Sequence, residues 1–355
     1  MTIKKTPIWL DCDPGHDDAF AIILAAEHPH LDLLGISTVH GNASLPRVTY
    51  NVLSILTSIG RTSIPVYSGC SKPFMRPAVH APDIHGSSGI DGTSLLPIPT
   101  ASAQPANAIT AMASAILSTP PQTCVLVATG TLTNIALLLA TFPAVAGHLR
   151  ALSVMGGAFG TRADARGNIT PHAEFNIYCD PEAAQSIFSN RALSGRITLV
   201  PLDITHTVLA TDEVLERLRY GGEGVRGSSE LRVMLVELLT FFRDTYAKVF
   251  GITAGPPLHD PLAVAAVLPT DEVQWEMEEV RVEVVCHGEE VGRTVKTREE
   301  PAVIGEGLGA GGKDPYTTVL VPKKVDVDAF WKLLLDMVTA ADGRYTWPET
   351  ATVDA

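Results

Sequence analysis

The chain has 355 residues, 46% of them hydrophobic, and a formal net charge of −13. This length can bury a large core, in one big α/β domain or in two ordinary ones. The acidic balance without a Lys/Arg-rich block argues against nucleic acid as a partner, and the apolar runs fall short of the ~20 residues that cross a membrane.

Strand-like apolar runs alternate with helical patterns over the first 200 residues. The expected strands lie at 6–11, 31–39, 123–129, 151–157 and 196–203, and the expected helices lie at 17–28, 44–60 and 131–142, with another beginning at Pro181. This alternation predicts an open, mainly parallel central sheet with helices on both faces, a Rossmann-like α/β fold.

The remainder of the chain continues with helices and a hairpin. A helical pattern over 212–250 is interrupted by the Gly-rich stretch "YGGEGVRGSS", and another helix begins at 259. Two alternating segments at 280–288 and 292–297 predict a hairpin, and 328–341 predicts a closing helix. With no linker-like break and no internal repeat, we expect one domain over residues 1–355.

The cysteines and the N-terminal segment indicate in which cellular compartment the protein is expected. The five cysteines are scattered without a C-x-x-C pair, which argues against a disulfide framework and a thiolate zinc site. The first residues, "MTIKKTPIWLDCD", contain no apolar region typical of a secretory signal. We therefore expect a cytoplasmic protein.

Four aspartates are crowded into the stretch "DCDPGHDD" at residues 11–18, between the first strand and the first helix. A lone aspartate at a helix start is usually a cap. Four converging carboxylates repel one another unless a cation neutralises them, and oxygen ligands favour a hard cation, calcium or magnesium. In parallel sheets, ligands bind beyond the carboxyl ends of the strands, so this cluster looks catalytic.

Polar residues also follow the other predicted strands. Amides, acids, a carbonyl and an imidazole suited to binding hydroxyls or a metal occur at Asn42, Thr129, Asn168, Glu174, Asn176, His259 and Asp260. Each is an ordinary loop residue on its own, and their shared position after strands is what indicates a site.

The motifs "DCDPGHDD", "TVHGN", "IHGSSG", "ATGTLTN", "VMGGAFG", "GNITPHAEFN", "DPEAA", "LDITH" and "PLHDP", in that order, resemble those of the nucleoside hydrolases, the inosine-uridine-preferring ribohydrolases. The resemblance covers nearly the whole chain. It implies the nucleoside hydrolase fold, a bound calcium ion, and hydrolysis of ribonucleosides to ribose and free base in a homodimer or homotetramer.

The resemblance also implies residue roles. Calcium ligands would be Asp13, Asp18, the carbonyl of Thr129 and Asp260. Asp13 would take a proton from the attacking water, and Asp11 would support the cluster from behind. Ribose hydroxyls would bind Asp17, Asn42, Asn168, Glu174 and Asn176. An anionic pocket of this kind suits the oxocarbenium-like centre that forms as the base departs.

The leaving base needs a proton or a hydrogen bond, and His259 and His85 are the two candidates. The Gly-, Pro- and Ser-rich segment 65–99 predicts a mobile lid. The run "GITAGPPLHDP" resembles pyrimidine-preferring members, which favours uridine, with inosine or nicotinamide riboside as alternatives. Side chains that could line the base pocket are Phe159, Phe175, Tyr246 and Phe250.

Three other interpretations compete with hydrolysis. The D-x-D pattern of magnesium-dependent phosphotransferases has Thr or Val two residues after the second Asp, where this chain has Gly15. The glycines Gly307, Gly309 and Gly312 match G-x-G-x-x-G, but a strand-like segment follows them instead of a helix. A protein that binds calcium and nucleosides without turnover is the third alternative.

Overall fold

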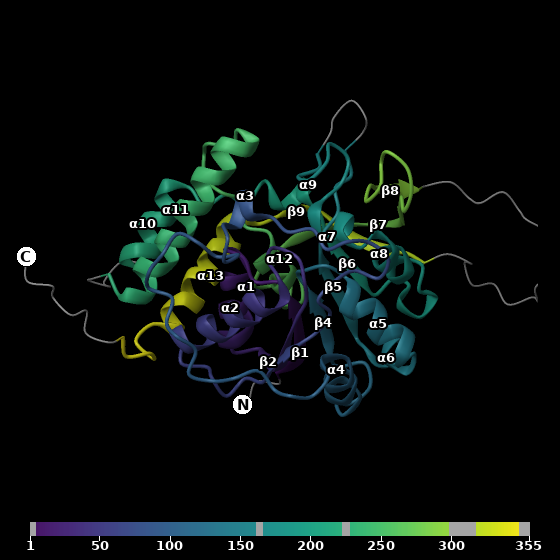
Figure 1. Cartoon of the computed structure of the whole chain (residues 1–355), viewed down its shortest axis with the longest axis horizontal. Coiled ribbons are helices and arrows are strands. Elements are labelled where there is room, and N and C mark those ends of the chain that lie inside the picture. Colours follow the sequence, from purple (N-terminus) through teal and green to yellow (C-terminus); the bar gives the residue numbers. More distant parts are fainter. Residues whose placement is uncertain (1–4, 161–165, 222–227, 298–316, 348–355) are drawn as a thin grey trace, which may run out of the picture.

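The computed structural model describes residues 5–160, 166–221, 228–297 and 317–347. Within these residues a nine-stranded sheet has the order β3-β2-β1-β4-β5-β6-β9-β7-β8 (Figure 1). The strands are β1 (Thr6–Cys12), β2 (Leu31–Thr38), β3 (Val66–Ser68), β4 (Val125–Ala128), β5 (Ala151–Met155), β6 (Ile197–Val200), β7 (Trp275–Val284), β8 (Thr294–Thr297) and β9 (Val319–Val325). Pairing is parallel from β3 to β9, and β7 pairs antiparallel with β9 and β8. The predicted mainly parallel α/β fold is confirmed.

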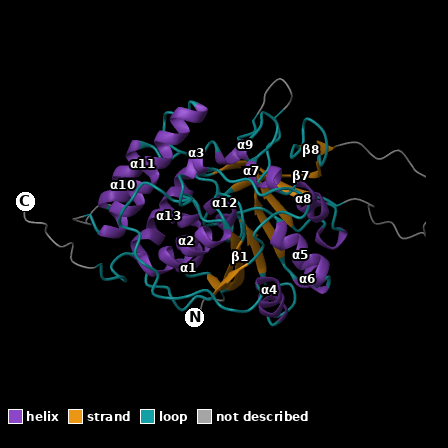
Figure 2. Ribbon diagram, viewed as in Figure 1, coloured by secondary structure: helices purple, strands orange, loops and turns teal. Residues whose placement is uncertain are grey.

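Helices cover both faces of the sheet (Figure 2). One face carries α1 (Asp18–Glu27), α2 (Leu45–Ser58), α10 (Asp212–Tyr220), α11 (Glu230–Phe250), α12 (Asp260–Ala265) and α13 (Val327–Ala341). The other carries α4 (Ala108–Leu117), α5 (Thr133–Thr141), α6 (Ala144–His148) and α8 (Pro181–Phe188). Successive residues of a strand point to opposite faces, so Ile8 and Leu10 join the first core while Trp9 joins the second.

The strand order places a topological switch beside β1. The chain runs from β1 outward to β2 and β3, and then returns to the other side of β1 to add β4, β5 and β6. The helices on either side of this point diverge, which leaves a crevice at the carboxyl ends of β1 and β4. The acidic stretch at residues 11–18 lies at this end of β1.

Local sequence explains where several helices begin and end. Asn107 caps α4 by accepting hydrogen bonds from the backbone N–H groups of Ile109 and Thr110, and Ser229 caps α11 in the same way. Helix α11 ends at Gly251, whose φ of 69° lies in the left-handed region that glycine tolerates best. Helix α1 is buried on nearly all sides, in keeping with its apolar sequence "DAFAIILAAE".

The predicted elements of the second half are also present. The helical pattern from 212 divides into α10 and α11, the hairpin is β7 with β8, and α13 is the closing helix. Elements that were not predicted are β3, α4, α6, the short helices α3 (Pro82–His85), α7 (Phe175–Cys179) and α9 (Leu202–Thr205), and the 3₁₀ turn at Arg191–Leu193. The glycines of the G-x-G-x-x-G match fall outside the described residues.

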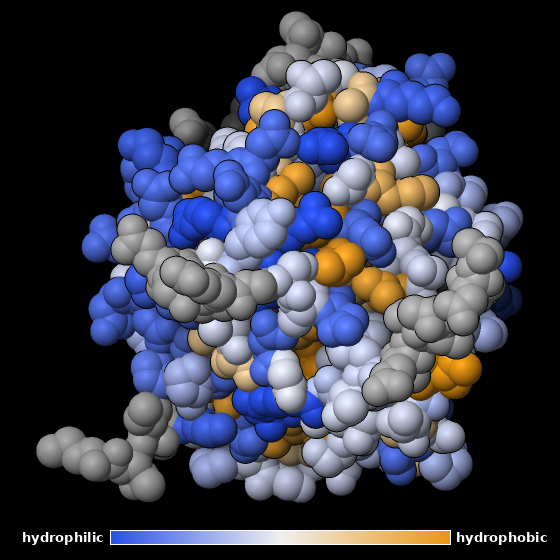
Figure 3. All heavy atoms as spheres, turned by 90° about the vertical axis from the view of Figure 1, so that its left-hand side faces the viewer, coloured by the Kyte–Doolittle hydropathy of each residue, from blue (hydrophilic) through white to orange (hydrophobic). Residues whose placement is uncertain are grey.

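One face of the molecule shows how polar and apolar side chains are distributed (Figure 3). The face on the left of Figure 1 carries mostly hydrophilic side chains, with apolar ones in small separate patches (Figure 3). No helix in the described part of the chain is both long and apolar enough to span a membrane.

Candidate active site

Strand register brings distant polar residues to one edge of the sheet. Asp11 on β1 lies opposite Ser37 on β2 and opposite Ala128 on β4. The residues that follow these strands, Asp13, Asn42 and Thr129, therefore emerge together. Their proximity is a consequence of parallel pairing, in which all the carboxyl ends share one edge.

Asp13 is fully buried and is held by the loop after β2. Its Oδ2 accepts a hydrogen bond from the backbone N–H of Asn42 at 2.8 Å, and its carbonyl accepts one from Asn42 Nδ2 at 3.1 Å. Its Oδ1 is buried and has no hydrogen-bond partner among the described residues. An unpartnered buried carboxylate oxygen is costly and points to a ligand that would satisfy it.

Two glycines make room for the Asp13 carboxylate. A Cβ on Gly41 would lie 1.8 Å from Asp13 Oδ2, and a Cβ on Gly130 would lie 2.6 Å from Oδ1. Real Cβ atoms do not approach other atoms so closely. Glycine at both positions therefore allows the backbone to enclose the carboxylate.

Asp11 is fully buried at the end of β1. Its Oδ1 accepts hydrogen bonds from the hydroxyl of Ser37 and from Asn134 Nδ2. Burial raises the pKa of Asp11 to about 7, against the lowering effect of these two hydrogen bonds.

Three carboxylates form the tightest group at the site. Asp17, Asp18 and Asp260 place oxygens within 4.8 Å of one another, and all three are buried. Asp18 accepts hydrogen bonds from the Gly15 backbone N–H and the Thr129 hydroxyl, each at 2.9 Å. Asp17 Oδ2 accepts the backbone N–H groups of His259 and Asp260 at 3.2 and 3.4 Å, which joins the start of α1 to the start of α12.

Burial and mutual repulsion govern the electrostatics of these acids. Burial, followed by the charge of Asp18, raises the pKa of Asp13 far above its usual range and that of Asp17 to about 7. Burial and then the charges of Asp17 and Asp18 raise the pKa of Asp260. A divalent cation would remove this conflict, because it stabilises the ionised carboxylates.

Amide side chains and one further acid border the carboxylate group. Glu174 caps α7, where its oxygens accept hydrogen bonds from the backbone N–H groups of Asn176, Ile177 and Gly157. Asn176 Nδ2 donates to the Thr129 carbonyl at 2.8 Å. Asn168 Oδ1 accepts the Phe175 backbone N–H at 2.8 Å. These contacts hold the polar groups in fixed positions.

A cavity of about 230 Å³ opens onto these groups. The predicted site residues that line it are Asp17, Asn42, His85, Thr129, Asn168, Glu174, Asn176, His259 and Asp260. Asp13, Asp18 and Asp11 lie behind this lining, fully buried. The structure therefore brings all twelve predicted residues to one place.

The apolar side of the cavity comes largely from α11. Its aromatic residues Phe242, Tyr246 and Phe250 line the cavity. They are joined there by Met155 at the end of β5, Ile169 in the loop that follows, and Phe175 at the start of α7. Phe159, a candidate for this pocket, is not among the lining residues, and its ring instead lies 4.5 Å from the Lys296 ammonium. Part of the segment 65–99 does border the cavity, at His80 and around α3.

Both predicted histidines are buried and hydrogen-bonded. His259 has Thr205 Oγ1 at 2.7 Å from Nδ1 and the Tyr246 hydroxyl at 2.8 Å from Nε2. His85 has its Nδ1 at 3.0 Å from Nδ1 of His16. Burial lowers the pKa of both His259 and His85, so both rings are neutral at neutral pH.

Sequence reasoning missed several residues that complete the site. His16 lies inside the first motif, and this position was the available signal for it. Thr205 lies inside the motif "LDITH" and Met155 inside "VMGGAFG", with no local sign of the contacts they make, and His80 carried no signal at all. Contacts between segments so far apart in sequence depend on the tertiary fold.

Comparison with known proteins places this geometry in a family. A model of the inosine-uridine preferring nucleoside hydrolases matches residues 8–332. The uridine nucleosidase of Saccharomyces cerevisiae is 36% identical over 98% of this chain and 99% of its own length. The pyrimidine-specific ribonucleoside hydrolase RihB of Shigella sonnei is 35% identical over 95% of this chain and 98% of its own length.

Solved structures give the same picture. A plant nucleoside hydrolase superposes with a TM-score of 0.79 at 28% identity, covering 94% of this chain and 99% of its own. A purine-preferring ribonucleoside hydrolase from Gardnerella vaginalis superposes with a TM-score of 0.79 at 26% identity, covering 94% of this chain and 98% of its own.

Proposed function

The chain belongs to the inosine-uridine preferring nucleoside hydrolase family and is a hydrolase of N-glycosyl compounds, and on this premise we propose that it is a calcium-dependent ribonucleoside hydrolase that prefers uridine. The observation that carries the proposal is the convergence of buried carboxylates and amides on one cavity whose opposite side is aromatic. Polar groups of this kind suit a sugar and a cation, and aromatic rings suit a base.

The donor set fits a hard divalent cation. Every candidate ligand atom is an oxygen, and the unpartnered Asp13 Oδ1 is available to it. Asp13, Asp18, Asp260 and the Thr129 carbonyl would hold calcium, since that carbonyl keeps a second lone pair beside its bond to Asn176. Asp17 lies in the same group of oxygens and faces the cavity, so it would contact both the ion and the sugar. When bound, calcium lowers the pKa of a water molecule.

The protein's own groups would then act on the water and the sugar. The Asp13 carboxylate accepts the proton of the attacking water. Asp17, Asn42, Asn168, Glu174 and Asn176 bind the ribose hydroxyls. The surrounding negative charge stabilises the positive ribosyl centre as the glycosidic bond breaks.

The departing base needs a hydrogen-bond donor at the aromatic side of the cavity. His259 does not present a free Nε2 there, because the Tyr246 hydroxyl occupies it at 2.8 Å. His259 would therefore act through Tyr246, whose hydroxyl would donate a hydrogen bond to the departing base, with Thr205 fixing the other ring nitrogen. His85, on the loop side, is the second candidate.

The preference for uridine rests on the named relatives and on the lining of the cavity. Both the yeast and the Shigella relatives carry names that specify uridine or pyrimidines. No Trp is among the residues that line the cavity in the described part of the chain. Inosine and nicotinamide riboside are the alternative substrates.

The test is steady-state release of base from uridine, cytidine, inosine, adenosine, guanosine and nicotinamide riboside, before and after calcium chelation. We expect uridine to have the highest kcat/KM and chelation to abolish release. A higher kcat/KM for inosine would contradict the preference. Binding of nucleosides without release of any base, in a folded sample that contains calcium, would overturn the proposed activity.

We also propose that residues 1–355 form one catalytic domain that assembles as a cytoplasmic homodimer or homotetramer. Support for one domain comes from the sheet, which combines strands from both ends of the chain, β1 at Thr6–Cys12 and β9 at Val319–Val325. Sedimentation velocity measures the oligomeric state directly, and a monomer at micromolar concentration would contradict the assembly.

A further inference from the structure

His16 is a buried histidine for which the proposed reaction has so far no role. It precedes the first turn of α1 and is fully buried. Its ring stacks on Phe241 and Phe242 of α11, each with centroids 5.2 Å away and planes within 5° of parallel. The two rings hold the imidazole in one orientation.

The hydrogen bonds of His16 determine which of its nitrogens carries the proton. Nε2 lies 2.7 Å from the carbonyl oxygen of Asp91. A carbonyl only accepts, so Nε2 carries the hydrogen. In a neutral imidazole the other nitrogen is then bare, and His16 Nδ1 is an acceptor.

This assignment extends to His85. His16 Nδ1 lies 3.0 Å from His85 Nδ1, and two bare nitrogens cannot form a hydrogen bond. His85 Nδ1 therefore carries the hydrogen and donates it to His16. Neutral His85 is left with a bare Nε2, to which no described side chain hydrogen-bonds. Since His85 lines the cavity, this nitrogen is available to a ligand there.

We propose that His16 is a positioning residue that fixes His85 as a hydrogen-bond acceptor toward the base, so that the site favours bases presenting an N–H, such as the ring imide of uracil or the lactam of hypoxanthine. The inference rests on the proposed function and deepens it. It also gives the two histidines different roles. His85 accepts a hydrogen bond from the base, while the His259–Tyr246 pair assists departure of the base.

The opposite arrangement would need a second proton on His16. Only then could His16 donate to His85 and leave His85 with a hydrogen on Nε2. That would bury an imidazolium against two phenyl rings with a histidine and a backbone carbonyl as its hydrogen-bonding partners. Burying a charge that has no carboxylate as a hydrogen-bonding partner is strongly disfavoured, and for this ring the cost of burial outweighs the attraction of the nearby Asp91 carboxylate.

The direct test is nuclear magnetic resonance of the calcium-loaded, substrate-free protein with ¹⁵N-labelled histidine. Long-range ¹H–¹⁵N correlations distinguish protonated from bare ring nitrogens, and His85→Gln identifies the signals of His85. We expect a protonated Nδ1 and a bare Nε2 for His85 at neutral pH. A protonated Nε2 in the unmodified protein would overturn the inference without any variant at His16.

Two substitutions at His16 test its role. His16→Leu keeps an apolar contact with the phenyl rings but removes the acceptor, and it should mix the two tautomers of His85. His16→Asn keeps an acceptor oxygen near the position of Nδ1 and should restore the single tautomer. A role in packing alone predicts no difference between the variants in the tautomer of His85.

Kinetics with a methylated substrate connect the tautomer to base recognition. His16→Leu should lower kcat/KM for uridine about tenfold, the effect of one lost hydrogen bond, and change that for N3-methyluridine less than twofold. His16→Asn should recover most of the loss. Equal losses on both substrates would overturn the link to the base. Absence of base release with the expected tautomer present would instead overturn the proposed function and leave the assignment of His16 in place.

Discussion

Glycine at position 41 is required by its neighbour Asp13. Gly41→Ala would place a Cβ 1.8 Å from Asp13 Oδ2, so the carboxylate would have to move away from the Asn42 backbone N–H. Displacing a reacting group by about 1 Å typically costs about 10²-fold in rate. We expect kcat/KM for uridine to fall by about that factor.

The matched control is Gly147→Ala. Gly147 lies in α6, and a Cβ there meets no atom within 4 Å. Its activity should stay within twofold, and the free energy of unfolding should rise by up to about 1 kcal/mol, because alanine is the better helix former. Similar activities for the two variants would show that the backbone at Gly41 can adapt.

Asp13 has two roles in the proposed reaction, as a cation ligand and as the acceptor of the water proton. Asp13→Asn removes the charge while keeping the shape. We expect kcat to fall by about 10²–10⁴-fold, the usual contribution of a general base, and calcium affinity measured by titration calorimetry to fall as well. Asp32→Asn, at an exposed position of β2, is the control. Unchanged calcium affinity would remove Asp13 from the ligand set.

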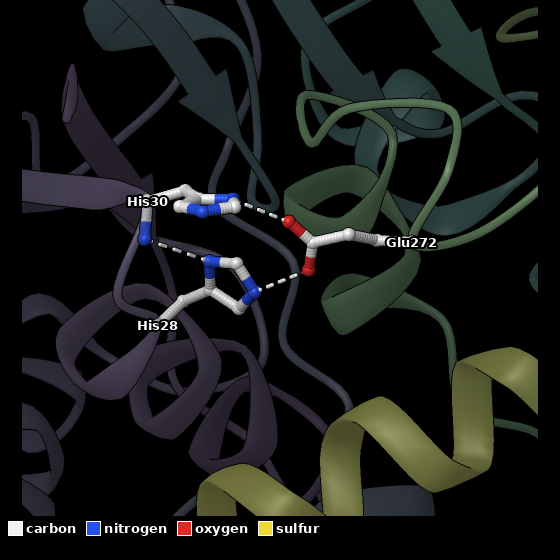
Figure 4. Close-up of side chains that lie close together, drawn as sticks. All are labelled: His28, His30 and Glu272. Atoms are coloured by element: carbon white, nitrogen blue, oxygen red, sulfur yellow. Dashed lines mark hydrogen bonds and ion pairs between the residues drawn. The ribbon is translucent and has the colours of Figure 1, made fainter. Parts of the chain in front are cut away.

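At the scale of elements, a second cluster joins segments far from the cavity. His28 and His30 lie between α1 and β2, and Glu272 lies between α12 and β7 (Figure 4). Glu272 Oε2 is 2.6 Å from His28 Nε2, and Oε1 is 2.5 Å from His30 Nδ1. The carboxylate thus bridges both imidazoles.

Two histidines and a glutamate are a familiar zinc-binding set, but the hydrogen bonding here has a different character. His28 Nδ1 accepts the backbone N–H of His30 at 3.2 Å, so Nε2 carries the hydrogen that it donates to Glu272. A neutral imidazole that binds metal through Nε2 needs its hydrogen on Nδ1. The geometry therefore fits a structural cluster in which Glu272 hydrogen-bonds to both His28 and His30, here called the clamp.

Loss of the clamp should affect stability more than catalysis. We expect Glu272→Ala to lower the free energy of unfolding by about 1–3 kcal/mol, because it removes the shared acceptor of two imidazoles, one of them buried. kcat/KM should stay within twofold. Denaturant unfolding measures the free energy of unfolding. The control is Asp271→Ala, at an exposed neighbouring position. A destabilisation no larger than that of the control would mean that water replaces the lost bonds.

At the scale of the whole molecule, the acidic cluster links cation binding to the pH dependence of folding. Burial raises the pKa values of Asp11 and Asp17 to about 7 from a usual value of 3.8. Between these values the cation-free folded protein binds more protons than the unfolded chain. Its free energy of unfolding therefore falls as pH rises from about 4 to about 7.

Calcium should offset this loss, since it binds the ionised carboxylates. We expect the stability difference between calcium-loaded and chelated protein to grow from pH 5 to pH 8. At pH 8 it should reach about 2.7 kcal/mol when free calcium is 100 times its dissociation constant. Denaturant unfolding at both pH values measures the difference, and Asp13→Asn should reduce it. An equal difference at both pH values would contradict the link.

Much of this protein was predictable from its sequence because the decisive signals are local. Alternating apolar runs and helical periods predicted the parallel sheet. The motif "DCDPGHDD" predicted an acidic cluster at the end of the first strand. Helix α4 escaped prediction, although its Asn107 cap and apolar residues are ordinary helix signals. Strand β9 was foreseen as a strand, but not its place between β6 and β7.

Tertiary structure alone decided how these parts meet. Chain order does not reveal strand order, because a strand pairs wherever its two faces are best buried, as β1 does between β2 and β4. The contacts of His16 with His85, and of His259 with Tyr246 and Thr205, join residues that are 69, 13 and 54 positions apart. Sequence determined which chemical groups are available, through local pattern and motif. Packing of the sheet and its helices determined which of those groups touch, and therefore which nitrogen carries each proton.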